Sequence, residues 1–272
     1  MRIRVRHTTS YSYTSHVEYE AQALRLAPRN HDGQRVLSWR VSDESGRDLP
    51  ATDDGYGNLV HLLSIVRSHR SAGVVAEGEV ETADTHGIVR EAAETLPVAY
   101  WRRTTEATAP NHALRQLAAE VEAVPDRIER LHRLMARVRE RIDYVIGHTD
   151  ATTTAAEALA HAKGVCQDHA HVFIACARLL GYPARYVSGY LWTSDQVLAG
   201  EAGHAWTEAH VPDLGWVGFD PANNTSPTEA YVRVAIGLDY GEAAPVRGVR
   251  RGGTAEEKLV VAVDVLSSQA QQ

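Results

Sequence analysis

The chain has very little cysteine, with only Cys166 and Cys176 in 272 residues. The two lie ten positions apart on one predicted helix, which separates them by about 15 Å along its axis. A disulfide needs Cα atoms about 6 Å apart, so we expect two free thiols. Free thiols are typical of proteins in a reducing compartment.

The sequence also lacks an excess of positive charge and a long apolar run. Its 35 acidic side chains outnumber the 28 basic ones, which argues against general nucleic-acid binding. No apolar run is long enough to cross a bilayer. The first residues alternate between arginine and apolar side chains, which predicts a strand with one solvated face rather than a polyanion site or a secretory signal. We therefore expect a cytoplasmic protein without nucleic-acid or membrane partners.

The N-terminal third carries strand-like alternation and no helical periodicity. Clusters such as Asp43-Glu44-Ser45-Gly46 supply turn residues between the apolar segments. The candidate strands are 3–9, 18–26, 34–42, 59–66 and 74–82. This pattern predicts an antiparallel, sandwich-like β domain. Its histidines are scattered without metal-binding spacing, so we interpret them as ordinary strand and surface residues.

The pattern becomes helical after a Thr- and Ala-rich connection, so we predict domains over 1–104 and 105–272. Asp126 is a candidate N-cap for a helix with an apolar stripe through Ile142. The many arginines of that helix favour a solvated surface over a basic docking face. Thr154 and Glu157 form a capping box for a short helix ending near Ala162, just before a cysteine.

Cys166 is predicted to lie at the first turn of a buried helix. An apolar run follows it, and Gly181 and Pro183 end that run. Free N–H groups and the helix dipole favour an anion at such a position, which lowers the pKa of a thiol. A lone cysteine at a helix start is usually structural, so a catalytic role depends on a partner base. Cys176 lies inside the apolar run and is interpreted as a small buried hydrophobe.

A base and an orienting acid for this cysteine are found downstream. His204 opens one predicted strand, and Asp220 closes the next. If these strands are antiparallel neighbours, the two side chains meet at one edge of the sheet, where the helix could also place Cys166. That order of residues provides a nucleophile, a base and an orienter. A zinc site at Cys166 is disfavoured because a helix points position 171 away from 166 and 169, and a fourth ligand is lacking.

Several motifs occur in an order that is specific to one family. They are Ala156-Glu157-Ala158-Leu159, Gly164-Val165-Cys166-Gln167-Asp168, Gly181-Tyr182-Pro183-Ala184-Arg185-Tyr186-Val187-Ser188-Gly189-Tyr190, His204-Ala205-Trp206, Gly215-Trp216-Val217-Gly218-Phe219-Asp220-Pro221 and Pro245-Val246-Arg247-Gly248. With them, the chain resembles the transglutaminase-like superfamily, and more narrowly its bacterial branch of transglutaminase-like enzymes and cysteine proteases. Residues 1 to about 100 resemble the N-terminal β domain of that branch. The chain departs from the family at Gly203, where Ser is more common, and at His169, where Phe or Tyr is.

The resemblance implies an α+β fold. An N-terminal antiparallel β-sandwich-like domain would be followed by a papain- or transglutaminase-like core, in which the helix bearing the cysteine packs on an antiparallel sheet. In the family, the matching Cys, His and Asp form the catalytic triad, which carries over to Cys166, His204 and Asp220. Tyr144 is a weaker candidate for a donor near the oxyanion.

The implied chemistry is acyl transfer through a thioester, with no cofactor and no metal. No acidic loop has Ca²⁺-ligand spacing, so calcium is not expected. We expect a peptide or protein amide substrate, and hydrolysis of a peptide or isopeptide bond as the first hypothesis. Transfer to an amine acceptor on the same triad is the alternative, and a non-catalytic interaction module with a relic site is the third. The sequence leaves the oligomeric state open.

Overall fold

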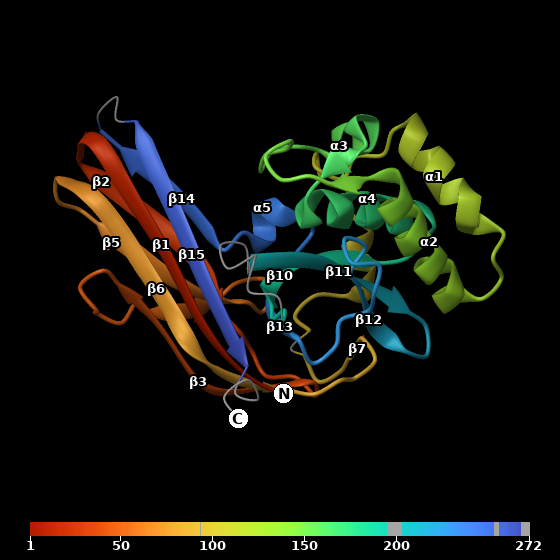
Figure 1. Cartoon of the computed structure of the whole chain (residues 1–272), viewed down its shortest axis with the longest axis horizontal. Coiled ribbons are helices and arrows are strands. Elements are labelled where there is room, and N and C mark those ends of the chain that lie inside the picture. Colours follow the sequence, from red (N-terminus) through yellow and green to blue (C-terminus); the bar gives the residue numbers. More distant parts are fainter. Residues whose placement is uncertain (93, 195–202, 253–255, 268–272) are drawn as a thin grey trace.

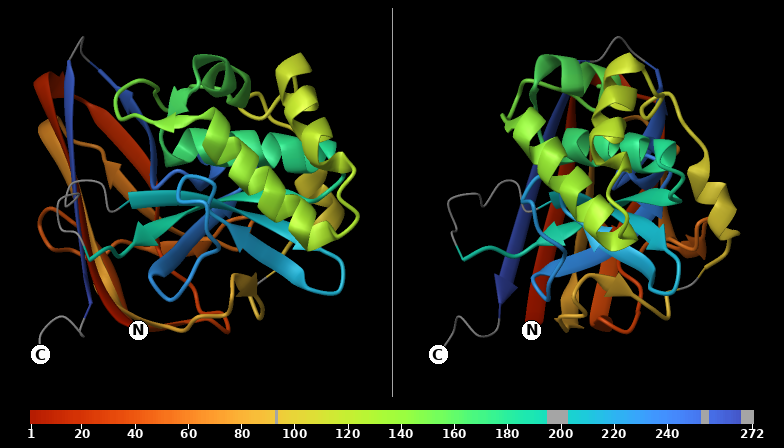
Figure 2. Two further views of the ribbon diagram at one scale, coloured as in Figure 1. Left: turned by 45° about the vertical axis from the view of Figure 1, so that its right-hand side comes forward. Right: turned by 90° about the vertical axis from the view of Figure 1, so that its right-hand side faces the viewer.

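The computed structural model describes residues 1–92, 94–194, 203–252 and 256–267. The fold is α+β. Two four-stranded sheets face one another in one half of the molecule, and the other half holds the helices and a five-stranded sheet (Figure 1). In both views of Figure 2 the helices cover one face of that five-stranded sheet.

The first half is an antiparallel β-sandwich, as the sequence predicted. One sheet has the order β15 (Glu257–Ser267), β1 (Arg2–Val17), β6 (His69–Thr82) and β3 (Gln34–Asp43). The other has the order β14 (Val246–Arg251), β2 (Tyr19–Ala27), β5 (Leu59–Ile65) and β4 (Ala51–Asp53). Leu24, Leu63 and Val74 are among the apolar side chains that form the core between the sheets.

The alternation of β1 produces the solvated face that the sequence predicted. Ile3 and Val5 are fully buried, while Arg4 and its neighbouring arginines on the other face pair with glutamates of β6. Arg4 Nη2, for example, lies 2.5 Å from Glu79 Oε1. These arginines are therefore engaged in cross-strand ion pairs, which fits a solvated strand face better than a polyanion site.

The last two strands return to the sandwich from the far end of the chain. β14 pairs with β2, and β15 pairs with β1 over eleven residue pairs from Ile3↔Ser267 to Tyr13↔Glu257. A division at residue 104 therefore separates strands that share hydrogen bonds. The division into two domains remains a proposal. In that division, residues 246–251 and 257–267 belong to the sandwich with the N-terminal strands, because they pair with β2 and β1.

The longer described helices of the second half are α1 (His112–Glu122), α2 (Arg127–Arg141), α3 (Ala155–His161) and α4 (Cys166–Leu179). Their starts follow the capping signals in the sequence. The Asp126 side chain accepts a hydrogen bond from the Glu129 N–H, and Thr154 with Glu157 forms a complete capping box. α4 ends where Gly181 adopts a positive φ of 86°.

The five-stranded sheet has the order β13 (Tyr231–Gly237), β10 (Ala184–Leu191), β11 (Gly203–Val211), β12 (Gly215–Phe219) and β7 (Ile88–Val89). β11 and β12 are antiparallel neighbours, as predicted, with Thr207 opposite Phe219. The shorter elements are the 3-10 helix η1 (Val98–Arg102), β8 (Asp143–Tyr144), β9 (Lys163–Gly164) and α5 (Tyr240–Ala243). Residues 172–177 of α4 are almost completely buried against this sheet and the other helices.

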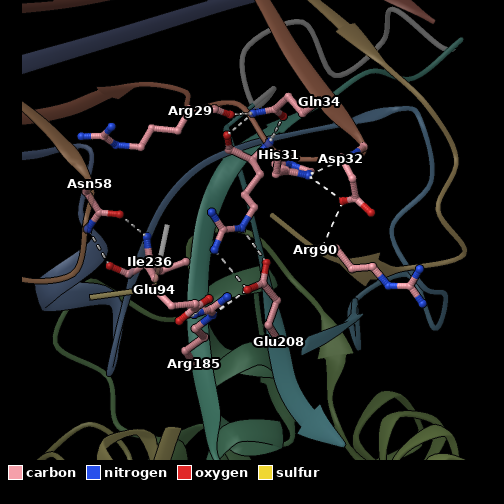
Figure 3. Close-up of polar contacts among 12 residues, drawn as sticks. Arg29, His31, Asp32, Gln34, Asn58, Arg90, Glu94, Arg185, Glu208 and Ile236 are labelled. Atoms are coloured by element: carbon pink, nitrogen blue, oxygen red, sulfur yellow. Dashed lines mark hydrogen bonds and ion pairs between the residues drawn. The ribbon is translucent and has the colours of Figure 1, made fainter. Parts of the chain in front are cut away.

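Two amide side chains fasten the sandwich to β13, which lies at the edge of the five-stranded sheet (Figure 3). Gln34 Nε2 donates to the Arg233 carbonyl, and its Oε1 accepts from the Arg233 N–H, both at 2.8 Å. Asn58 binds the Ile236 carbonyl and N–H in the same way, at 2.8 and 2.9 Å. Each amide thus occupies the place of one residue of a further strand. We call these two contacts the amide clamps.

Replacement of Asn58 by alanine is expected to lower the free energy of unfolding by about 2–4 kcal/mol, because it leaves a buried N–H and a buried carbonyl of Ile236 without partners. Chemical denaturation measures this. Asn30 provides the matched control, since its exposed amide accepts one hydrogen bond from the Val36 N–H. Equal losses in Asn58→Ala and Asn30→Ala would show that the clamp adds nothing beyond an ordinary surface contact.

An ion cluster lies beside the clamps in the core (Figure 3). Glu208 is fully buried and accepts from Arg185 Nε at 2.6 Å and from Arg233 Nε at 2.7 Å. Arg185 also donates to Glu94 at 2.9 Å, and its guanidinium stacks 3.8 Å above the ring of Trp216. Burial acts to raise the pKa of Glu208, but the two guanidinium charges outweigh it and lower the pKa to about 2.

Candidate active site

Cys166 is the first residue of α4, where the sequence placed it. The loop before it is held by Asp168, whose Oδ2 accepts from the Val165 N–H and from the Thr149 hydroxyl, both at 2.7 Å. Gly164 is required for this arrangement, because a Cβ there would lie 2.6 Å from the Asp168 side chain. Asp168 therefore acts as a capping carboxylate at the start of α4.

The His169 side chain also holds the loop before Cys166. One ring nitrogen lies 2.8 Å from the Val165 carbonyl oxygen, and the other lies 3.0 Å from the Ile142 carbonyl oxygen. The imidazole thus ties the cysteine loop to the segment that carries Tyr144, whose ring is 6.1 Å from that of His169. These two contacts give His169 a structural role in holding the cysteine loop.

The other two predicted residues meet at the edge of the five-stranded sheet. His204 lies near the start of β11, and Asp220 follows the end of β12. Because the strands are antiparallel, the side chains come together, and His204 Nε2 donates to Asp220 Oδ2 at 2.7 Å. Nδ1 is therefore the ring nitrogen available to the Cys166 thiol, with which His204 also interacts.

Asp220 is fully buried and surrounded by donors. Its Oδ1 accepts from the N–H groups of Ala222 and Asn223, at 3.0 and 3.2 Å. Its Oδ2 accepts from the Tyr231 hydroxyl at 2.8 Å and from Asn223 Nδ2 at 2.7 Å, in addition to His204. Burial acts to raise the pKa of Asp220, but these hydrogen bonds and the charge of His204 hold it below the ordinary value. The carboxylate is therefore fixed as an anion that orients the imidazole.

The charge of His204 is set by the same contacts. Burial acts to lower the pKa of His204, but the hydrogen bonds and charges of Asp220 and Cys166 raise it to about 10. The ring is therefore an imidazolium at neutral pH. Because the folded-state pKa lies above the unfolded value of 6.5, the charged ring stabilises the fold fully below pH 6.5, and this contribution is lost as the pH rises toward 10.

The histidine and tryptophan residues nearby have supporting roles. Trp206 is buried and stacks on His204 with ring centroids 6.2 Å apart, while buried Trp216 packs against Arg185. His171 is buried and accepts a hydrogen bond from the Tyr240 N–H at 3.1 Å. Burial lowers the pKa of His171 to about 4, so the ring is neutral at pH 7 and serves a structural purpose rather than that of a second base.

Tyr231 and Asn223 are site residues that the sequence patterns did not reveal. Asn223 follows the Asp220-Pro221 turn directly, so its place beside the carboxylate is a local consequence of that turn. Tyr231 comes from β13, which is not adjacent to β12 in the sheet. Only the strand order could have indicated its position.

A cleft of about 410 Å³ lies in front of Cys166 and His204. Both residues line it, as does Tyr144, whose side chain is 41% exposed. Within the described part of the chain, no three His, Cys, Asp or Glu side chains are grouped as a metal site requires. Among the described helices, none has the length and apolar character needed to cross a membrane.

Comparisons with known proteins agree with this architecture. Residues 115–221 match the model of the transglutaminase-like superfamily, and residues 3–81 match the bacterial transglutaminase-like N-terminal region. An uncharacterized protein of Mycobacterium leprae is 32% identical over 278 residues, covering 96% of this chain and 97% of the relative. An uncharacterized protein of Mycobacterium tuberculosis is 30% identical over 294 residues, covering 97% and 92%.

Among solved structures, the "putative cysteine protease" of Cytophaga hutchinsonii superimposes with a TM-score of 0.77. The alignment covers 98% of this chain and 91% of that one, at 18% sequence identity. At that identity the likeness establishes a common fold for both halves of the molecule.

Proposed function

The chain belongs to the transglutaminase-like superfamily, and from this we propose that it is a cysteine-dependent amide acyl-transfer enzyme. In the proposed triad, Cys166 is the nucleophile, His204 the acid–base residue and Asp220 the orienter. The observation that carries the proposal is the position of His204. It lies between a buried carboxylate, 2.7 Å from its Nε2, and a cysteine at the start of a helix that lines a cleft.

In the proposed reaction, the Cys166 thiolate attacks the amide carbonyl carbon and forms a tetrahedral oxyanion. The Asp168 and His169 N–H groups already donate to the Val165 carbonyl, at 3.1 and 3.2 Å. The N–H groups of Cys166 and Gln167, which open α4 and have no carbonyl of an earlier helical turn to bind, are the proposed backbone donors for that charge. We add the Tyr144 hydroxyl as the proposed side-chain donor. As the C–N bond breaks, the imidazolium of His204 gives its proton to the leaving amine, and a thioester remains on Cys166.

We propose hydrolysis as the second half of the reaction, with a peptide or protein amide as the substrate. His204 then takes a proton from water, which attacks the thioester and releases the acid and the thiolate. The partial exposure of Cys166 at the cleft supports this choice, because water can reach a thioester formed there. An amine acceptor in place of water would give transglutaminase chemistry, which incorporation of a labelled primary amine would reveal. We propose the cytoplasm as the compartment, since a thiol nucleophile stays reduced there.

The proposal is tested by the rate of Cys166 alkylation with iodoacetamide against pH, read by peptide mass spectrometry. An activated pair should alkylate well below the pH at which a free thiol ionises. His204→Ala should slow the reaction at pH 6 by about tenfold or more, since the cation that stabilises the thiolate is gone. A profile like that of a free thiol in both proteins would reject the proposed triad.

A further inference from the structure

The cleft at Cys166 is built jointly by both halves of the molecule. The N-terminus of α4, β10, β11 and α5 form one wall, and strands β1, β2, β14 and β15 of the sandwich form the other. The sandwich wall therefore combines strands from the N-terminal part of the chain, β1 and β2, with strands from its C-terminal part, β14 and β15.

The part of the sandwich wall that β15 contributes to this cleft is apolar. Leu259, Val261 and Val263 of β15 point to the cleft side of the strand, opposite Tyr11, Thr9 and His7 of β1. Leu259 is 49% exposed and Val261 is 42% exposed. Covering such half-exposed aliphatic side chains with an apolar group of a ligand would be favourable, because it removes apolar surface from water.

The described residues that line the cleft include no carboxylate and no lysine. The guanidinium of Arg25 is already neutralised, because its Nε lies 3.0 Å from Asp54 Oδ2. His7 contacts the Thr9 and Tyr190 hydroxyls, and its burial lowers its pKa to about 4, so it is neutral at pH 7. Among the described lining residues, Arg25 is thus the one charged side chain outside the proposed catalytic pair, and it is already paired with Asp54, although its Nη1 has no hydrogen-bond partner. The described walls therefore offer little charge to recognise a charged substrate group.

Building on the proposed function, we propose that the substrate places a large, uncharged apolar group against Leu259 and Val261, next to the amide that Cys166 attacks. A volume of about 410 Å³ admits an aliphatic or aromatic side chain together with the amide. β15 is therefore the specificity wall of the site, although it lies about a hundred residues after Cys166 in the sequence.

Chloroacetamides with different arms test this without knowledge of the natural substrate. The Cys166 thiolate displaces chloride and forms a thioether, so the rate reports how well the arm fits. We expect the N-benzyl compound to react at least about tenfold faster than the N-carboxymethyl and N-aminoethyl compounds, after each rate is divided by that with glutathione. Equal normalised rates would overturn the proposal.

Two neighbouring residues of β15 provide a matched pair of variants. Val261→Asp should remove most of the preference for the benzyl arm and favour the aminoethyl arm. Val260 is 50% exposed on the opposite face of the strand and does not line the cleft, so Val260→Asp should leave the preference unchanged. Equal effects of the two substitutions would also overturn the proposal.

The alkylation profile of Cys166 separates this proposal from the proposed function. A wild-type pH profile that is unaffected by His204→Ala would reject the triad, while a benzyl preference sensitive to Val261→Asp would still establish the apolar wall. An activated cysteine without any preference among the arms would retain the triad and reject the wall.

Discussion

Replacement of Cys166 by alanine is expected to reduce hydrolysis of an activated acyl compound, such as p-nitrophenyl hexanoate, at least about a thousandfold. The proposed mechanism passes through a thioester on this sulfur, and no other group lining the cleft can form it. The wild type should release a burst of nitrophenolate equal to the enzyme concentration. Mass spectrometry should then find the acyl group on the peptide that contains Cys166.

The second cysteine provides the control for this experiment. Cys176 lies on the same helix but is fully buried, with its Sγ 3.5 Å from the Leu114 carbonyl oxygen. Burial raises the pKa of the Cys176 thiol to about 12, so it remains protonated and inert. Cys176→Ala should therefore keep the burst. A burst that survives in Cys166→Ala would mean that the acyl group is transferred elsewhere.

Replacement of Glu208 by glutamine is expected to lower the free energy of unfolding by about 3–5 kcal/mol at pH 7. The amide keeps the shape of the side chain but removes the carboxylate that Arg185 and Arg233 share, so that Arg185 keeps only its ion pair with Glu94. Arg185 is completely buried, so water cannot replace the lost partner. Urea denaturation of the two proteins measures the difference.

The pH dependence of this difference follows from the lowered pKa of Glu208. The carboxylate contributes its full stability above an unfolded pKa of about 4.5, and the contribution is lost as the pH falls toward about 2. The matched control is Glu140→Gln, which removes an exposed partner of Arg137 and should cause no measurable change. Equal stability of Glu208→Gln and the wild type would show that the cluster is not important for folding.

The sequence predicted those parts of the site that depend on local signals. The capping pattern around Thr154 and the apolar run after Cys166 specify helix ends, because caps and glycines act within a few residues. The antiparallel arrangement of His204 and Asp220 could be anticipated because a short connection joins their strands. The strand pairing and the hydrogen bond between the two side chains agree with that expectation.

Contacts between distant parts of the chain could not be predicted in the same way. Gln34 meets Arg233 across 199 positions, and Asn58 meets Ile236 across 178 positions. The sequence around Gln34 and around Asn58 does not distinguish either residue from an ordinary polar residue on the surface. The pairing of β15 with β1 could not be predicted from the sequence either, because a strand with alternating apolar residues can pair with any open edge of a sheet.

The amide clamps also affect whether the edge of the five-stranded sheet can pair with a strand of another molecule. β13 is an edge strand, and its outward N–H and carbonyl groups would offer a template on which a second molecule could add a strand. Gln34 and Asn58 cover this template at two places with side chains that imitate a strand but cannot be extended. The opposite edge ends in β7, which is only two residues long. The sheet that carries His204 thus offers little free backbone for intermolecular β-pairing at either of its two edges.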